Sequence, residues 1–225
     1  DCGWDYIDDM SGKLLNNTLI NSSRAEEMQV ISEVKLWDVV NRPPGVKVIG
    51  TRWVDVNKAD EANPYYRSRL VVQEYKQGSE WAFFTATPPL ETLRLLLICG
   101  TIKMIPSLDG NLHSGSRCEN PYVFMQIDIR RAHFYSPARR TVHVELPPEA
   151  KQPKNKVGKL LKTMYGCRDA GVNWEMCILE EMTKLGSQQG TSSPCIYWHK
   201  GKSLRVWVYG DDFVVMGHYN DVKWL

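Results

Sequence analysis

Residues 208–217 read VYGDDFVVMG, in which two adjacent carboxylates lie between two apolar runs. Valine, tyrosine and phenylalanine in short runs favour β-strands, and Gly-Asp favours a tight turn. The stretch therefore predicts an antiparallel hairpin with Asp211 and Asp212 at its tip. Two carboxylates so close repel each other, and a fold that keeps them usually offsets the repulsion with cations. On these residues alone, a solvated turn without function explains the pair equally well.

The residues just before this hairpin predict two more strands and a helix. The ranges 195–199 and 204–209 have strand composition and are separated by the tight turn 200–202. Asp169 is expected to cap a helix that ends at Gly186. The apolar side of this helix is formed at spacings of three and four residues by Trp174, Ile178, Met182 and Leu185.

The first half of the chain predicts a long hairpin and two further helices. The hairpin is expected from the strand-like ranges 46–56 and 65–75, which are separated by a cluster of turn residues. One helix is expected to begin after Pro89. Another is expected to begin at Ser23 and to run through Leu36.

The middle of the chain contains a long polar segment and two short strands. Residues 106–121 are rich in Ser, Gly and Asn and predict an unusually long loop. Strands are expected at 123–129, with Asp128 near its end, and at 142–146. A strand-end aspartate by itself is more often a cap than a catalytic group. The lysine-rich range 151–162 suits contacts to nucleic-acid phosphates, but a solvated basic loop explains it at least as well.

The bulk composition indicates an ordinary intracellular protein. The formal net charge of +2 neither demands nor excludes a nucleic-acid partner. None of the six cysteines forms a C-x-x-C pair, which argues against a zinc knuckle or a redox site. The acidic start lacks the features of a signal peptide, and the longest apolar stretch, 93–105, is too short to span a bilayer. We therefore expect no membrane partner and a cytoplasmic or nuclear location.

Several blocks of the chain together resemble the reverse transcriptase of copia-type LTR retrotransposons. They occur in that family's order over most of the chain. The blocks are IGTRWVDVNK (49–58), YRSRLVVQEYKQ (66–77), IDIRRAHFY (127–135), VHVELPPE (142–149), KLLKTMYGCRDAGVNW (159–174), PCIYWH (194–199) and VYGDDFVVMG (208–217). Gly210, which replaces the family's usual branched residue, makes 209–212 identical to a tetrapeptide typical of viral RNA-dependent RNA polymerases. The blocks 66–77 and 159–174 do not belong to those polymerases.

The order of the expected strands and helices predicts an α+β fold, and the resemblance implies the fingers and palm of a right-hand polymerase. Its antiparallel palm sheet would be backed by helices, and the thumb would be absent. Residues 1–24 are then a lead-in segment, and residues 25–225 form the fingers/palm domain, with 106–121 as a loop insertion.

The resemblance also implies a catalytic site built from three aspartates. Asp128 and Asp211 would bridge two Mg²⁺ ions, for which Mn²⁺ is an alternative, and the backbone carbonyl of Ile129 would assist. Asp212 would complete the carboxylate cluster and position the primer end. Oxygen ligands of this kind suit Mg²⁺, and two such ions about 3.5–4 Å apart promote nucleotidyl transfer. We expect the three carboxylates to meet at one open cleft.

Four further residues are implied in nucleotide binding. Arg67 and Arg69 lie two apart on a strand, so both point to one face, where they would hold the triphosphate. A merely exposed strand face is the alternative for this pair. His133 stands where the family has an aromatic residue that excludes the 2′-hydroxyl, so sugar selection is expected to be poor. Asp169 replaces the family's glutamine, and its charge is expected to weaken triphosphate binding.

Two functions follow as hypotheses. The first is RNA-directed DNA polymerisation, in which a primer 3′-hydroxyl on an RNA or DNA template is extended from deoxynucleoside triphosphates with Mg²⁺. The second is a degenerate, non-catalytic retroelement remnant that at most binds nucleic acid, which the departures at His133 and Asp169 favour. The three aspartates favour the first hypothesis. The sequence gives no indication of oligomeric state.

Overall fold

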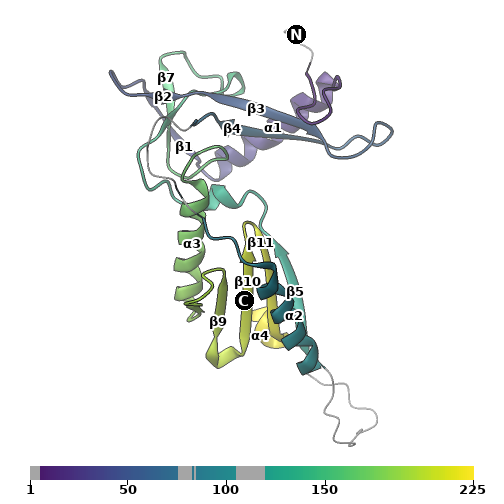
Figure 1. Cartoon of the computed structure of the whole chain (residues 1–225). Helices are drawn as coiled ribbons and strands as arrows, with labels where there is room; N and C mark the ends of the chain where they lie inside the picture. Colours follow the sequence, from purple (N-terminus) through teal and green to yellow (C-terminus); the bar gives the residue numbers. More distant parts are fainter. Residues whose placement is uncertain (1–5, 76–82, 84, 105–119) are drawn as a thin grey trace, which may run out of the picture. The chain divides into compact units, whose positions relative to one another are not determined.

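The computed structural model of the protein describes residues 6–75, 83, 85–104 and 120–225 (Figure 1). Nearly all of the loop expected at 106–121 lies outside these residues. The described chain mixes α-helices with strands in three sheets, so the expected α+β class is confirmed at this level. No helix among these residues combines the length and the apolar character needed to cross a membrane.

The chain divides into two compact units. Unit 1 consists of Asp1–Phe83 and His133–Trp174, and unit 2 consists of Phe84–Ala132 and Glu175–Leu225. The division falls inside helix α3 (Ala170–Lys184), whose first residues belong to unit 1. Each unit is described by itself below.

Unit 1 contains a four-stranded sheet and a separate hairpin. The sheet has the strand order β1-β7-β6-β2, and the hairpin pairs β3 with β4 along seven residues of each strand. The strands are β1 (Trp37–Asn41), β2 (Val48–Ile49), β3 (Thr51–Asn57), β4 (Tyr66–Val72), β6 (His143–Val144) and β7 (Lys156–Leu160). Two short 3₁₀ turns accompany them, η1 (Ala132–Tyr135) and η2 (Pro148–Ala150).

Helix α1 (Asn17–Glu33) packs on β4 and closes the core of unit 1 (Figure 1). Ile31 from the end of the helix is buried with Leu70 of β4, Phe134 of η1 and Val144 of β6. Each of these side chains is almost completely removed from water, so together they contribute several kcal/mol to the stability of the unit, at about 1.5–3 kcal/mol for each buried side chain.

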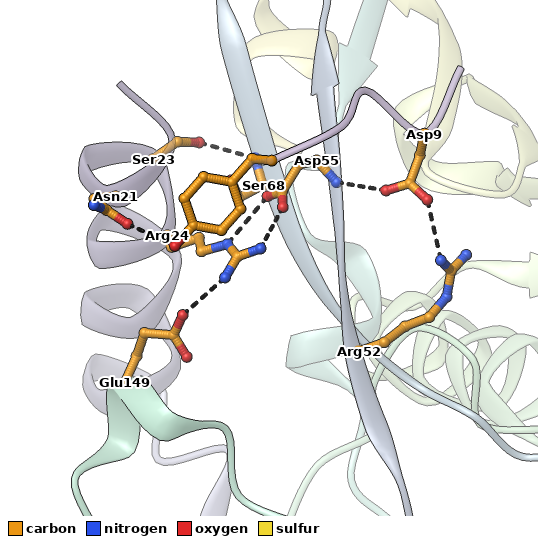
Figure 2. A network of polar contacts seen from close by, with 9 residues as sticks. Asp9, Asn21, Ser23, Arg24, Arg52, Asp55, Ser68 and Glu149 are labelled. Atoms are coloured by element: carbon orange, nitrogen blue, oxygen red, sulfur yellow. Dashed lines mark hydrogen bonds and ion pairs between the residues drawn. The ribbon is translucent and has the colours of Figure 1, made fainter. Parts of the chain in front are cut away.

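A charged network fastens α1 to the hairpin (Figure 2). The guanidinium of Arg24 lies 2.5 Å from Asp55 on β3 and 3.1 Å from Glu149 on η2. The Ser23 hydroxyl accepts the Ser68 backbone N–H of β4 at 2.8 Å. On the other side of β3, Asp9 accepts the backbone N–H of Asp55 at 2.9 Å. The N-terminal segment is therefore part of the folded structure from residue 6 onward.

Unit 2 is built on a five-stranded antiparallel sheet with the order β5-β11-β10-β9-β8. Helix α2 (Leu90–Met104) packs on β5, β10 and β11, and helix α4 (Tyr219–Trp224) packs on β5 and β11. The strands are β5 (Tyr122–Asp128), β8 (Gln188–Gln189), β9 (Ile196–His199), β10 (Leu204–Tyr209) and β11 (Asp212–His218), and the turn η3 (Lys200–Lys202) joins β9 to β10. The expected antiparallel sheet with helices packed on it is thus present.

Three expectations about local structure need correction. The helix expected to begin at Ser23 begins at Asn17, because the side chain of Asn16 accepts the N–H groups of Thr18 and Leu19 as an N-cap. The single strand expected at 46–56 is two strands, since β2 pairs with β6 and β3 pairs with β4. The lysine-rich range contains β7, which lies between β1 and β6. A solvated loop is therefore wrong for 156–160, although Lys159 itself is exposed.

Candidate active site

The hairpin of β10 and β11 presents the two adjacent aspartates at its turn. Tyr209 pairs with Asp212, so Gly210 and Asp211 form a two-residue loop. Gly210 has a φ of 62°, a left-handed value that glycine adopts without strain. It occupies the first central position, which glycine fills in type II′ hairpin turns. The turn predicted from the sequence is therefore present.

Strand β5 brings the third aspartate to the same end of the sheet. Asp128 is the direct antiparallel partner of Asp212, and side chains of direct partners lie on the same face of a sheet. The backbone N–H of Ile129 donates to the carbonyl of Asp211 at 3.0 Å, which ties the end of β5 to the hairpin turn. Residues more than eighty positions apart in the sequence thus become neighbours through strand pairing.

The three carboxylates have no cationic partner in the described part of the chain. Asp128 and Asp211 are exposed and Asp212 is half-buried. None of the three side chains forms an ion pair or a hydrogen bond with another described residue. Like charges directly opposite each other in a sheet are destabilising, so this arrangement costs the fold some stability.

The chemistry of these groups fits a hard divalent cation. Carboxylate oxygens together with a backbone carbonyl form the donor set that Mg²⁺ prefers. As placed here, no three His, Cys, Asp or Glu side chains among the described residues are close enough to share a metal ion. The expectation that the three carboxylates meet at one open cleft therefore stays a prediction.

Arg67 and Arg69 lie on β4 in unit 1, on the face opposite the buried side chains of that strand. Burial alternates along β4, with Ser68, Leu70 and Val72 buried, so the expected common face for the two arginines is confirmed. Arg67 is exposed and Arg69 is half-buried. The guanidinium carbon of Arg69 lies 4.6 Å from the centre of the Tyr165 ring, within the range of a cation–π contact.

His133 begins the part of the chain that returns to unit 1. Its ring meets the Tyr165 ring edge-on, with the centroids 5.1 Å apart. Its backbone carbonyl accepts hydrogen bonds from the Thr163 hydroxyl at 2.7 Å and from the Ser136 N–H at 3.2 Å. His133 is therefore held both by its backbone and by its ring.

Asp169 is buried and ion-paired within unit 1. Only 5% of the residue is exposed, and its carboxylate lies 2.9 Å from the Arg140 guanidinium and 2.9 Å from the Asn173 amide. Burial acts to raise the pKa of Asp169, but the hydrogen bond and the charge of Arg140 outweigh it and leave the pKa below its ordinary value. Arg140 offsets the negative charge of Asp169 only in part, because Glu74 shares the same guanidinium. The expected weakening of triphosphate binding stays a prediction.

The comparison with known proteins identifies the family. Residues 34–224 match the family described as reverse transcriptase (RNA-dependent DNA polymerase). The chain belongs to this reverse transcriptase family. The match covers both units and includes all of the site residues described above.

The relatives of this reverse transcriptase domain are retrotransposon polyproteins. The chain is 25% identical over 191 residues to the retrovirus-related Pol polyprotein from transposon RE1 of Arabidopsis thaliana. It is 24% identical over 199 residues to that from transposon TNT 1-94 of Nicotiana tabacum. These alignments cover 81% and 85% of the chain but only 12% and 14% of the relatives. A truncated Ty1-A Gag-Pol polyprotein of Saccharomyces cerevisiae is 24% identical over 98 residues, covering 43% of the chain and 8% of that relative. The resemblance to copia-type elements is confirmed.

The range that matches the reverse transcriptase family contains residues whose importance the sequence alone did not indicate. Arg140 contacts both Asp169 and Glu74, and Glu74 also accepts the backbone N–H of Arg168 at 2.9 Å. Tyr165 contacts both Arg69 and His133. Tyr165 belongs to a quoted block, so its tyrosine-glycine pair was a usable signal. Nothing local to Arg140 distinguished it from the other arginines of the chain.

Proposed function

We propose that this chain is the part of a copia-type Pol polyprotein that carries RNA-directed DNA polymerase activity. The observation that carries the proposal is the pairing of Asp128 with Asp212 beside the Asp211 turn. These carboxylates have no partner among the described residues and cost the fold stability. A binding function for a cation explains why the sequence keeps them.

The proposed reaction joins a nucleotide to a primer. The primer 3′-oxygen forms a bond to the α-phosphorus of a deoxynucleoside triphosphate, while the bond from that phosphorus to the bridging oxygen breaks and pyrophosphate leaves. Asp128, Asp211 and the Ile129 carbonyl would hold two Mg²⁺ ions, or Mn²⁺ in their place. Bound divalent ions supply charge stabilisation for both the attacking and the leaving oxygen. Asp212 would position the primer end.

Groups of unit 1 are proposed to bind the incoming nucleotide. Arg67 and Arg69 present guanidinium groups that suit phosphate oxygens, and Arg69 has no ion pair or hydrogen bond with any described residue. His133 would lie at the sugar, where an imidazole leaves more room than a larger aromatic ring and can donate a hydrogen bond to a 2′-hydroxyl. Asp169 would act near the nucleotide, with its charge partly offset by Arg140.

The proposed partners follow from this chemistry. They are an RNA or DNA template with its primer, and deoxynucleoside triphosphates. The proposed location is intracellular, in the cytoplasm or the nucleus. The fingers and palm assignment belongs to the same proposal, with the antiparallel sheet of unit 2 as the palm.

Primer extension tests the proposal directly. The chain is supplied with poly(rA)/oligo(dT) and dTTP, with and without Mg²⁺. We expect extension that requires Mg²⁺ and that falls on the order of a hundredfold or more in Asp211→Asn, since that substitution removes a charged group acting on the transition state. Asp38→Asn, which changes an exposed aspartate outside the site, is the matched control and should retain the activity.

Two results would contradict the polymerase proposal. One is the absence of extension with either Mg²⁺ or Mn²⁺ by a chain whose melting transition shows that it is folded. The other is extension that Asp211→Asn does not affect. The first result together with retained binding of the template–primer would favour the non-catalytic remnant.

A further inference from the structure

The turn that contains Tyr165 is fixed to the end of strand β4. The backbone N–H of Val72 donates to the carbonyl of Tyr165 at 2.8 Å. The next residue, Gly166, has a φ of 85°, and a Cβ atom there would lie 2.0 Å from the Val72 carbonyl oxygen. No other residue type allows this approach without displacing the strand. The tyrosine-glycine pair therefore sets the position of Tyr165 against the strand that carries Arg69.

The ring of Tyr165 contacts two of the residues proposed to bind the nucleotide. The guanidinium carbon of Arg69 lies over the ring, 4.6 Å from its centre. The ring of His133 meets it edge-on at 5.1 Å, with an interplanar angle of 79°. Phe134, which is fully buried, packs against it at 5.7 Å and limits its movement. The Tyr165 ring thus contacts both the residue proposed to bind the triphosphate, Arg69, and the residue proposed to lie at the sugar, His133.

A second arginine of unit 1 stacks in the same way but has different partners. Arg24 lies over the Tyr6 ring at 4.4 Å. Its guanidinium forms ion pairs with Asp55 and Glu149, as Figure 2 shows. Arg69 forms no ion pair with a carboxylate among the described residues. Stacking leaves the N–H donors of a guanidinium free at its edge. The Arg69 guanidinium is therefore held in position by the Tyr165 ring, while its positive charge is not paired with a carboxylate. This arrangement suits the binding of an anion.

We propose that Tyr165 is a positioning residue for nucleotide binding. Its ring holds the Arg69 guanidinium in place for the triphosphate and fixes the His133 ring at the sugar. This inference rests on the proposed function, because it assigns Arg69 and His133 to the nucleotide. It adds a residue to which the sequence assigned no role, and it gives a physical reason for the tyrosine-glycine pair at 165–166.

The test measures nucleotide affinity without requiring catalysis. Mg²⁺·dTTP is titrated into the full chain, and binding is followed by NMR through the Arg69 side-chain Nε–H signal and backbone amides. Arg69→Ala should weaken binding about tenfold or more, since charge-assisted contacts to phosphate are among the stronger hydrogen bonds. Tyr165→Leu should weaken it about fivefold, or ~1 kcal/mol. Tyr165→Phe, which keeps the ring, should stay within about twofold.

A double variant and a matched control separate positioning from general stability. If Tyr165 acts through Arg69, then Arg69→Ala combined with Tyr165→Leu should bind no more weakly than Arg69→Ala alone. Tyr6→Leu removes the nearer of the two rings that Arg24 contacts, the other being Trp53. It should leave dTTP affinity within about twofold, even if it lowers the melting temperature. If Tyr165→Leu does not fold, Tyr165→Met keeps the bulk of the side chain without the aromatic face.

The outcomes distinguish this inference from the proposed function. Binding that depends on Arg69 but is unchanged in Tyr165→Leu would overturn the inference alone. Additive losses in the double variant would do the same, because they would show independent effects. Absence of dTTP binding by the folded wild-type chain would overturn the nucleotide role of Arg69, and with it the role of Tyr165.

Discussion

Glu74 and Asp169 of unit 1 share the guanidinium of Arg140, whereas the carboxylates of the unit 2 hairpin have no cation beside them in the described part of the chain. The first two side chains are 12% and 7% exposed, and their oxygens lie 2.5 and 2.9 Å from Arg140. Asp128 and Asp211 are exposed. Both sets of side chains are carboxylates, but those in unit 1 are largely buried and ion-paired, whereas Asp128 and Asp211 in unit 2 are exposed and unpaired among the described residues.

The difference shows which charges serve the fold. A buried carboxylate without a partner is strongly unfavourable, so Arg140 is needed once Glu74 and Asp169 leave water. Exposed carboxylates on paired strands keep their hydration, and their mutual repulsion costs only a little. The Arg140 group of unit 1 therefore holds loops together, whereas the three aspartates of unit 2 are merely tolerated by the fold. This contrast is why we propose a ligand for the hairpin and not for the Arg140 group.

The largest expected effect on stability comes from removing Arg140. Arg140→Leu leaves Glu74 and Asp169 partly buried without a cation and should destabilise unit 1 by about 2–3 kcal/mol, less than for a fully buried pair because the arginine is itself partly exposed. Asp211→Asn should change stability by no more than about 0.5 kcal/mol. Urea unfolding, combined with hydrogen exchange of peptides from each unit, measures both changes. Equal losses of stability in the two variants would contradict the contrast between the Arg140 group and the hairpin aspartates.

A smaller effect is expected from pH, through another carboxylate that unit 1 holds by hydrogen bonds. The backbone N–H of Asn57 and that of Ser11, together with the N–H of Met10, lower the pKa of Asp8 to about 2, from an ordinary value of 3.8. Because the folded pKa is the lower one, this stabilisation is present above pH ~4 and is lost as the pH falls toward 2; it amounts to about 1–2 kcal/mol.

Stability measured as a function of pH tests this expectation. Asp8→Asn should be less stable than the wild type at neutral pH, and the two should converge as the pH falls from 4 to 2. The lowered pKa of Asp169, in which the Arg140 hydrogen bond outweighs burial, acts in the same direction, so the Asp8→Asn variant should still lose some stability in acid. A difference between the two proteins that stays constant over this range would show that the charge of Asp8 contributes nothing.

The smallest expected effect concerns the turn that presents the unit 2 carboxylates. Gly210 has a left-handed φ, and a Cβ atom there would meet no atom within 4 Å, so Gly210→Val should cost only backbone strain of about 1–2 kcal/mol. Gly12, at φ 71° and equally open, provides the matched control in unit 1. Both variants should lose similar stability, and each should keep primer extension, because a branched residue is usual at position 210 in the family. A loss of extension in Gly210→Val alone would show that this chain needs glycine at the turn to place the aspartates.

Local sequence patterns predicted the elements that carry the candidate catalytic residues. The strand-favouring residues of 208–217 and 123–129, together with the Gly-Asp turn at 210–211, correctly indicated the hairpin and the strand before it. The helix that follows Asp169 was also correct, with Trp174, Ile178 and Met182 buried, although Leu185 at its end is exposed. Each of these features depends on residues that are close together in the sequence. For that reason the sequence was sufficient for them.

The start of α1 shows where local patterns failed. Asn16 and Ser23 are both good N-cap residues, and nothing local decides between them. The structure begins the helix after Asn16, while the Ser23 hydroxyl accepts the Ser68 N–H of β4. A tertiary contact to the hairpin thus occupies the side chain that the sequence predicted as a cap.

The sequence by itself determined the family and the hairpin that presents Asp211 and Asp212, because these depend on motifs and on short runs of residues along the chain. Only the tertiary structure decided which charges are balanced and which remain available. Arg140 meets Asp169 across 29 residues of sequence, and Tyr165 lies beneath Arg69 because β4 is bonded to the turn at Gly166. Such pairings require distant segments to come together, and their energy depends on burial and distance, which no local pattern contains.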